Sequence, residues 1–311
     1  MTTILFSHPS CLDHDPGPYH PENPARLEAV LGAFEGPGFA RLERHEAPRA
    51  EDWQLELAHD REHVRRILGA IPPVGRAHLD PDTVVSPGSG EAALRAVGAV
   101  TAAVDAVMAG GAGAAFCAVR PPGHHALPRR AMGFCLFNNV AIGALHARRR
   151  HGLKRVAVVD FDVHHGNGTQ AVFEHDPDLF YASTHQWPLY PGTGALHETG
   201  VAGNIVNVPL APGSGSKEFR GAIRGRVRPA LEAFRPELLF ISAGFDAHRQ
   251  DPLAGLNLET EDYGWVTTEL TDATRESSGG RVVSALEGGY SLDALAASAA
   301  AHVRALIAGS G

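Results

Sequence analysis

The sequence of 311 residues has few cysteines and no long hydrophobic run. Its three cysteines, Cys11, Cys117 and Cys135, lack the paired spacing of a structural metal site. An odd number without an apparent secretory segment indicates a reducing compartment, so we expect core positions for them and a cytoplasmic location for the protein. The longest apolar stretch, around residues 97–116, is rich in Ala and Gly and contains Asp105, so no membrane span is predicted.

Basic patches and internal repeats are lacking as well. The formal net charge is −8 at pH 7, which suits a cationic substrate such as a lysine side chain or a polyamine, and equally suits plain solubility. No basic stripe is interleaved with aromatic residues, so we expect no nucleic acid partner. The polar motifs run from Arg26 to Tyr290 with no low-complexity linker, which favours a single catalytic domain over residues 1–311.

The segment VVDFDVHHGNGTQ, residues 158–170, places carboxylates and imidazoles at two-residue spacing where an apolar strand ends. Residues two apart in an extended backbone point to the same side, so Asp160, Asp162 and His164 share a face. His165 points away from it. Ligands of open α/β sheets gather at the carboxyl ends of strands. Two of the three side chains are therefore placed to hold a divalent cation while the third supports them; the alternative is a strand end with solvated acids.

Three further segments carry polar residues at comparable positions. The apolar strand 238–242 is followed by a turn of small residues and by Asp246, a candidate third metal ligand. A Pro-Pro-Gly turn precedes His124 and His125, and adjacent imidazoles suggest paired acid and base work. A strand near the C-terminus ends in EGGY, whose two glycines leave Tyr290 at a cleft rim, where a phenol can donate to a developing oxyanion.

These segments belong to a longer set of motifs that resembles the histone deacetylases and their prokaryotic relatives, the acetylpolyamine amidohydrolases and acetoin-utilization proteins. The nearest resemblance is to the bacterial class II histone deacetylase-like amidohydrolases. It runs nearly end to end, and eight motifs in the same order rarely agree by chance. The motifs are HPENPARL (20–27), DTVVSPGS (82–89), RPPGHHA (120–126), GFCLFNNVAIGA (133–144), DFDVHHGNGT (160–169), YPGTG (190–194), SAGFDAH (242–248) and EGGY (287–290).

Strand-like and helix-like segments alternate along the chain, which predicts an α/β fold with a largely parallel sheet and helices on both faces. The resemblance implies the arginase-deacetylase fold, with about eight parallel strands. The expected strands are 3–7, 114–119, 155–161, 178–183, 204–210, 237–243 and 281–286, and the expected helices are 24–32, 91–108, 138–150, 216–234, 259–276 and 291–308. The loops at 72–89 and 187–200 are long and rich in Gly and Pro, as site-building loops often are.

The resemblance implies a metal centre. Asp162, His164 and Asp246 would hold the ion and leave coordination positions open for water and an acyl carbonyl. Zinc is the expected ion. Ferrous iron and cobalt also suit two carboxylates and one imidazole, and the sequence does not separate them.

The resemblance also assigns the proton transfers. Asp160 would accept a hydrogen bond from His124, and His125 would take the proton from water and return it to the leaving amine. Asn167 stands where class I relatives carry an aspartate, and an amide raises imidazole basicity less than a carboxylate does, so the division of labour between the histidines stays open. Tyr290 would donate to the carbonyl oxygen and to the oxyanion that forms from it.

A substrate channel follows from the same comparison of motifs. Its walls would be apolar, and a carboxylate at the mouth would bind substrate backbone or, equally, cap a turn. The channel residues are Gly133, Phe134, Tyr190, Leu253 and Asp82. Arg26 would line an inner passage for acetate, with helix entry as the alternative role for its segment.

Structural potassium ions are implied by the resemblance alone. The ligands would be mostly main-chain carbonyls, which leave little signature in a sequence. The first site would use Asp160, Asp162, His164, Ser183 and Thr184, and the second Phe173, Asp176 and Leu179.

Three functional classes remain open. The favoured one is a zinc-dependent deacylase for lysine side chains of proteins or peptides, because the rim residue Leu253 stands where polyamine-selective relatives carry a glutamate. The second is an amidohydrolase for acetylated polyamines or other small amides. The third, a non-catalytic acyl-lysine binding module, would require damage to a catalytic set of which no member is missing. The oligomeric state and the preferred acyl length are not readable.

Overall fold

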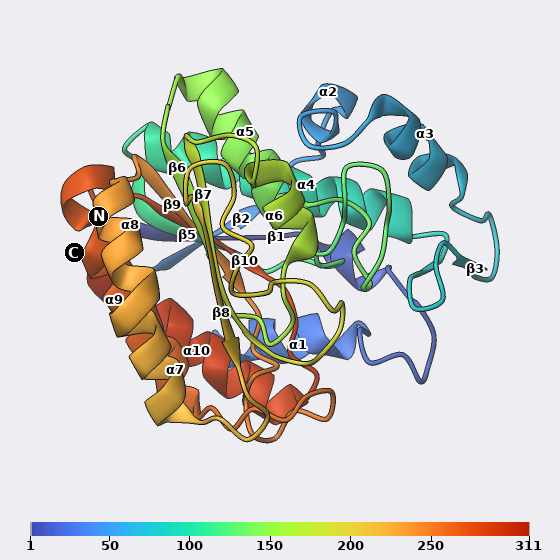
Figure 1. Ribbon diagram of the computed structural model, residues 1–311. Coiled ribbons are helices and arrows are strands. Elements are labelled where there is room, and N and C mark those ends of the chain that lie inside the picture. Colours follow the sequence, from blue (N-terminus) through green and yellow to red (C-terminus); the bar gives the residue numbers. More distant parts are fainter. Residues whose placement is uncertain (1, 311) are drawn as a thin grey trace.

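The computed structural model describes residues 2–310, in which a twisted sheet is covered by helices on both faces (Figure 1). All neighbouring strands of the sheet are parallel, in the order β2-β1-β5-β10-β9-β6-β7-β8. The strands are β1 (Thr2–Ser7), β2 (Leu42–Glu46), β5 (Ala112–Cys117), β6 (Val156–Asp160), β7 (Leu179–Gln186), β8 (Ile205–Leu210), β9 (Leu238–Ala243) and β10 (Val282–Leu286). The predicted α/β architecture is confirmed.

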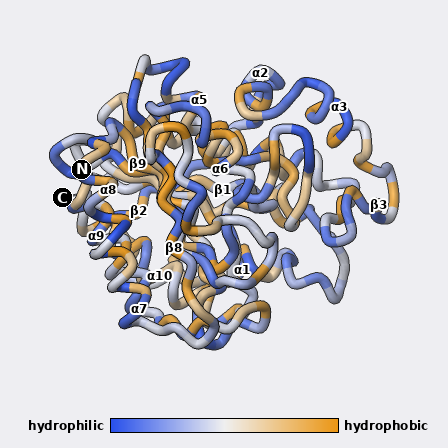
Figure 2. The backbone as a smooth tube through the Cα atoms, viewed as in Figure 1, coloured by the Kyte–Doolittle hydropathy of each residue, from blue (hydrophilic) through white to orange (hydrophobic). Residues whose placement is uncertain are grey.

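The central strands are mostly apolar because both of their faces are covered. Every residue of β6, β9 and β10 is buried, and Figure 2 shows the corresponding hydrophobic band through the middle of the molecule. A short antiparallel ribbon, β3 (Ala77–His78) with β4 (Val84–Val85), lies in the long loop that was expected to have no regular structure. The three cysteines are buried and unpaired, as predicted.

Two groups of helices sandwich the sheet. On one face α4 and α5 pack against each other and against the central strands, and on the other α1, α9 and α10 form a second layer. The helices are α1 (Ala25–Ala33), α2 (Asp52–Leu55), α3 (Arg61–Gly69), α4 (Ser89–Met108), α5 (Asn139–His151), α6 (Asn167–Phe173), α7 (Ser216–Ala222), α8 (Arg228–Phe234), α9 (Thr260–Ser278) and α10 (Leu292–Gly309), with 3-10 turns at Pro9–Leu12 and Pro37–Phe39.

Two helical expectations need correction. The helix predicted over 216–234 is interrupted by a π-helical turn at Ile223–Val227, which separates α7 from α8. Pro229 lies at the start of α8 and has no N–H to donate to the preceding turn, which explains why a regular α-helix does not continue through it. The short helices α2, α3 and α6 were not predicted, although α3 has an amphipathic pattern in which Val64 and Ile67 are buried.

The helix α10 has the length and composition that a membrane-spanning helix would need, with a mean hydropathy of 1.2 over 18 residues. It packs against α1 and α9, the other helices of its layer, and against strands β1 and β5 of the sheet. Burial of this face accounts for its apolar content, as in the core helices of other folded proteins.

Candidate metal and catalytic site

Two neighbouring strands bring the candidate metal ligands together. Strands β6 and β9 pair so that Asp160 lies beside Ser242, and the chain after each strand turns over the carboxyl edge of the sheet. There Nδ1 of His164 lies 3.1 Å from Oδ1 of Asp162 and 3.1 Å from Oδ2 of Asp246. The ligand atoms of these three residues all lie within 4.8 Å of one another. The structure therefore places the three predicted ligands around one point.

Backbone amides hold both carboxylates in place. Oδ2 of Asp162 accepts a hydrogen bond of 2.8 Å from the Gly288 amide, and Oδ1 of Asp246 accepts one of 2.8 Å from the Val163 amide. The main chain also passes close behind these groups. A Cβ atom at Gly244 would lie 2.0 Å from Asp162 Oδ2, and one at Gly288 would lie 2.1 Å from Asp246 Oδ2. Glycine is therefore required at both positions for the carboxylates to reach the site.

The donor set fits a divalent cation of the zinc, iron or cobalt type. Both carboxylates are buried, and two buried negative charges side by side are costly without a cation. Burial, together with the charge of Asp162, raises the pKa of Asp246 to about 7. Asp162 shows the opposite direction: burial opposes ionisation, but the imidazolium charges of His124 and His164 hold its pKa far below the usual value.

The two adjacent histidines lie above this cluster in different electrostatic surroundings. Nδ1 of His124 is 3.0 Å from Oδ2 of Asp160, and although burial lowers the pKa of His124, Asp162 and Asp160 raise it to about 10. Nδ1 of His125 is 2.8 Å from Oδ1 of the neutral Asn167. Burial and the charges of its histidine neighbours lower the pKa of His125 far below the ordinary value. One imidazole is thus suited to carry a charge and the other to accept a proton.

Tyr290 enters the same pocket from the loop after β10. Its amide donates 2.7 Å to Oδ2 of Asp251, while no hydrogen bond joins its hydroxyl to another described residue. The guanidinium of Arg26 lies 4.8 Å from the centre of the Tyr290 ring and donates to the carbonyls of Glu287 and Gly289. Arg26 is fully buried and also donates to Glu22, so its observed contacts fix the loop that carries Tyr290.

A pocket of about 250 Å³ opens above the cluster, and most of its lining is apolar. All five predicted channel residues line it. Its lining residues are Asp82, Pro122, His124, His125, Gly133, Phe134, His164, Leu189, Tyr190, Leu253, Gly288 and Tyr290. The predicted metal, base, donor and channel positions therefore meet in one cavity, and Arg26 lies behind its wall.

The loop of Gly133 and Phe134 has an unusual backbone. Both residues have positive φ, 57° and 68°, and a Cβ atom at Gly133 would lie 2.3 Å from the His125 ring. Oδ1 of Asp82 accepts a hydrogen bond of 3.0 Å from the Gly133 amide, and the Thr83 hydroxyl accepts one from the Phe134 amide. Asp82 thus stabilises this loop through one oxygen while lining the pocket mouth.

Two supporting carboxylates escaped the sequence analysis. Oδ1 of Asp251 accepts from the Leu253 amide at 3.0 Å, so Asp251 ties the rim residue to the loop of Tyr290. Oε2 of Glu287 accepts from the amides of Gly123 and His124, at 2.7 and 3.1 Å, and burial raises the pKa of Glu287 to about 7. Both acids lie within or next to recognised motifs, but their amide partners are distant in sequence.

The predicted potassium positions differ in their surroundings. At the first, the hydroxyl of Thr184 is buried without a hydrogen-bond partner, and the Ser183 hydroxyl is 2.9 Å from Nδ1 of His185. A buried oxygen without a partner in the described protein is compatible with a monovalent cation. At the second, the carbonyls of the predicted ligands surround Nδ2 of Asn204 instead, at 3.0, 3.1 and 2.8 Å from Phe173, Asp176 and Leu179.

Comparison with known proteins identifies the family. Residues 20–306 match the histone deacetylase domain. The chain is similar to the histone deacetylase-like amidohydrolase of Pseudomonas aeruginosa, with 39% identity covering 93% of this chain and 82% of the relative. It is also similar to the chloroplastic histone deacetylase 14 of Arabidopsis thaliana, with 38% identity covering 98% and 76%.

A solved structure gives the same result. The crystal structure of the HDA15 HD domain superimposes with a TM-score of 0.93 and 36% identity, covering 99% of this chain and 90% of that one. The eight-stranded sheet is accordingly the arginase-deacetylase fold, as the motifs implied. The chain belongs to the histone deacetylase family.

Proposed function

We propose that this protein is a zinc-dependent amidohydrolase that removes acetyl or other acyl groups from lysine side chains of proteins or peptides. The observation that carries the proposal is the cluster of Asp162, His164 and Asp246, whose His164 shares one pocket with His125 and Tyr290. A divalent ion held by the three ligands would supply Lewis acidity for the attacking water and for the amide carbonyl. The remaining chemistry belongs to side chains of the chain itself.

His125 carries out the proton transfers, and the adjacent His124 supports them. His125 donates its Nδ1 proton to Asn167, which leaves Nε2 unprotonated to accept a proton from the attacking water. As the carbon–oxygen bond forms, the charge on the carbonyl oxygen is stabilised by the Tyr290 hydroxyl. The proton taken by His125 then passes to the amine nitrogen as the carbon–nitrogen bond breaks. His124, hydrogen-bonded to Asp160, lies beside the reacting groups and supports them.

The pocket walls favour an acyl-lysine side chain. Phe134 and Tyr190 both line the cavity, and each buried methylene of a lysine stem contributes about 0.8 kcal/mol. Leu253 gives the rim an apolar side chain instead of a charge. A second candidate function, hydrolysis of acetylated polyamines or other small amides, is supported by the amidohydrolase name of the Pseudomonas relative and by the net negative charge.

Metal dependence is tested by chelation and reconstitution. The apoprotein should lose hydrolysis of acetyl-lysine peptides, and added Zn²⁺, Co²⁺ or anaerobic Fe²⁺ should restore it to different extents. Asp246→Ala should lose both activity and the corresponding equivalent of metal, because two remaining ligands hold an ion weakly. Full activity of metal-free protein would refute the proposal.

Substrate class is tested by kcat/KM values for acetyl-lysine peptides, longer acyl peptides and acetylated polyamines, measured side by side. Preference for peptides supports the favoured function, and preference for polyamines supports the second. Binding of acyl-lysine peptide without any turnover by the metal-loaded protein would instead indicate a binding module. A structural potassium ion at Thr184 and a cytoplasmic location remain part of the proposal.

A further inference from the structure

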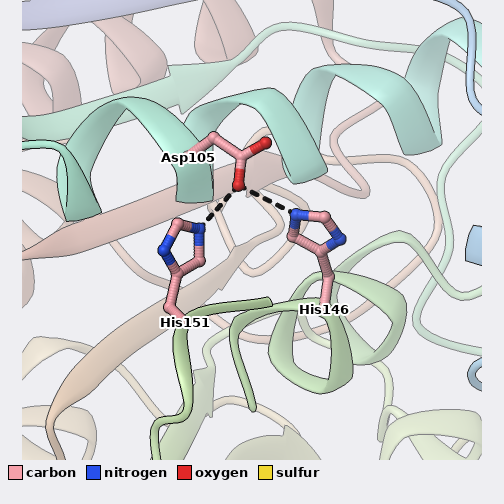
Figure 3. Close-up of side chains that lie close together, drawn as sticks. All are labelled: Asp105, His146 and His151. Atoms are coloured by element: carbon pink, nitrogen blue, oxygen red, sulfur yellow. Dashed lines mark hydrogen bonds and ion pairs between the residues drawn. The ribbon is translucent and has the colours of Figure 1, made fainter. Parts of the chain in front are cut away.

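A second group of potential metal ligands, separate from the catalytic cluster, joins α4 to α5 (Figure 3). Asp105 projects from α4, and His146 and His151 project from α5. Nε2 of His146 lies 2.9 Å from Oδ1 of Asp105, and Nε2 of His151 lies 2.6 Å from the same oxygen. Both imidazoles therefore point their outer nitrogens at a single carboxylate oxygen, and all three ligand atoms lie within 4.8 Å of one another.

The topology places this group at the edge of the sheet opposite the pocket. Helix α5 begins beside the catalytic loops, where the Asn138 side chain bonds Ala126 and Thr169, and it ends at His151 just before β6 starts. The candidate catalytic ligands follow the other end of β6. The Asp105 group is thus separated from the catalytic pocket by the length of α5, and it belongs to neither the pocket nor its supporting loops.

The burial of the three side chains suits a ligand site that opens to solvent on one side. The side chain of His146 is 3% exposed, that of His151 23% and that of Asp105 50%. Nδ1 of His146 is buried without a hydrogen-bond partner, so nothing in the described protein fixes the proton on the other nitrogen. With its single proton on Nδ1, the neutral ring can therefore offer the Nε2 lone pair to a metal ion, and no hydrogen bond of Nδ1 within the described protein has to break.

The surroundings restrict the motion of the ligands and leave space for water. The Trp53 ring stacks on His146 with 5.8 Å between ring centres and 30° between ring planes. The Arg149 guanidinium lies 5.9 Å from the centre of the Trp53 ring. A cavity of about 430 Å³ adjoins the group and is lined by Glu51, Trp53, Gln54, Asp105, His146, Arg149 and Arg150. The two arginines oppose a cation, so weaker binding than at the buried catalytic cluster is expected.

We propose that Asp105, His146 and His151 form a second divalent-metal site that cross-links α4 to α5. Two imidazoles and one carboxylate select zinc-like ions over magnesium or calcium, and three protein ligands leave a position for water from the cavity. Because the ligands come from two helices, a bound ion stabilises the folded state and raises the unfolding temperature as its concentration rises. The site is independent of the catalytic one.

The stoichiometry of Zn²⁺ binding tests the site. Equilibrium dialysis of the chelator-treated full chain should give two equivalents, one tight and one weaker. His151→Gln and Asp105→Asn should each remove the weaker equivalent and leave peptide hydrolysis unchanged. Asp246→Ala should remove the tight one and leave the weaker one, so failure of this site and failure of the proposed catalytic centre are distinguishable.

A matched control excludes adventitious binding by surface histidines. The side chain of His175 is 80% exposed and lies 3.5 Å from that of Glu174, so His175→Gln should retain both equivalents. Co²⁺ gives an independent readout, since its visible absorption bands report ligand type, and the bands of the weaker site should vanish in His151→Gln. A single equivalent in the wild type, or two equivalents in both His151→Gln and Asp105→Asn, would overturn the proposal.

Discussion

Nδ1 of His125 lies 2.8 Å from the side-chain oxygen of Asn167, so a neutral amide accepts a hydrogen bond from the imidazole N–H. The adjacent His124 instead faces a carboxylate, that of Asp160, at 3.0 Å. The pKa of His124 is raised to about 10 and that of His125 is lowered, because burial is offset by nearby carboxylates only for the first. The centres of the two rings are only 4.0 Å apart, yet the groups bonded to them give the two imidazoles different affinities for a proton.

The substitution Asn167→Asp should move the pH dependence of catalysis. A carboxylate in hydrogen-bond contact raises an imidazole pKa by about 1 to 3 units, so His125 should become protonated, and inactive as a base, at a higher pH. The acidic limb of kcat/KM should therefore shift upward in pH, as measured with one peptide substrate from pH 5 to 9. An acidic limb at its wild-type position would show that His125 is not the base.

Tyr290→Phe should lower kcat by about a hundredfold or more, because one oxyanion donor is lost. Since the hydroxyl has no hydrogen-bond partner among residues 2–310 and the ring keeps its contact with Arg26, the unfolding temperature should stay near the wild-type value. Tyr263→Phe is the matched control. That hydroxyl is buried and donates 3.1 Å to the Phe245 carbonyl, so its loss should cost about 1 kcal/mol of stability with little change in kcat. Equal kcat in Tyr290→Phe and wild type would contradict the assignment.

Leu253→Glu should raise the ratio of kcat/KM for acetylated polyamines over peptides by roughly tenfold, on the order of 1 to 2 kcal/mol. The backbone of this residue is fixed by Asp251, so the new carboxylate would stay at the rim, where it attracts a distant ammonium. Leu253→Gln separates charge from lost apolar contact: it should lower peptide turnover without the gain for polyamines. An identical ratio in the two variants would rule out the charge effect.

His302 should make stability depend on pH below neutrality. It is fully buried, with Nδ1 2.6 Å from the Thr267 hydroxyl and Nε2 2.8 Å from the Ser284 hydroxyl, and burial lowers its pKa to about 3. Between pH 3 and the ordinary value near 6.5, the unfolded chain binds a proton that the folded chain does not. The free energy of unfolding therefore falls as pH drops through this window, by about 1.4 kcal/mol per pH unit.

His302→Gln removes this proton uptake while keeping a polar side chain. Urea unfolding at several pH values between 4 and 6.5 should give a shallower pH dependence in the variant, even if its stability at pH 8 is lower. Other groups contribute equally to both proteins, so the difference in slope isolates the histidine. Parallel slopes would mean that His302 is protonated in the folded state.

The central part of the fold and the cluster of site residues could be predicted from the sequence because both depend on patterns within short segments. Uninterrupted apolar strands such as β6 and β9 require cover on both faces, and parallel strands bring the residues that follow them to one edge. The two-residue spacing of Asp160, Asp162 and His164 pointed to one site, but the extended backbone assumed for it ends at Asp160, and the chain bends at residues 162–164. Family resemblance supplied the roles that spacing alone left open.

The features that were not predicted depend on contacts between segments distant in sequence, or lie at the edge of the sheet. Strand β2 has the sequence LERHE with only Leu42 buried, and such a polar edge strand gives no apolar signal. Asp251 and Glu287 act through amides of other loops, which no pattern announces. Asp105 entered the sequence analysis only as a break in an apolar run, because its histidine partners lie 41 and 46 residues later.

The two glycines behind the metal cluster invert the usual ranking of mutational severity. Alanine is ordinarily a mild replacement, yet at Gly244 or Gly288 its methyl group would occupy the place of a carboxylate oxygen of Asp162 or Asp246. Either change would therefore resemble the deletion of a ligand. In a survey of all single substitutions, these positions without a functional group should be as intolerant as the ligands themselves, while the half-exposed rim at Tyr190 accepts variation. Substitutions can therefore change the substrate range at the rim, whereas the metal centre tolerates few changes.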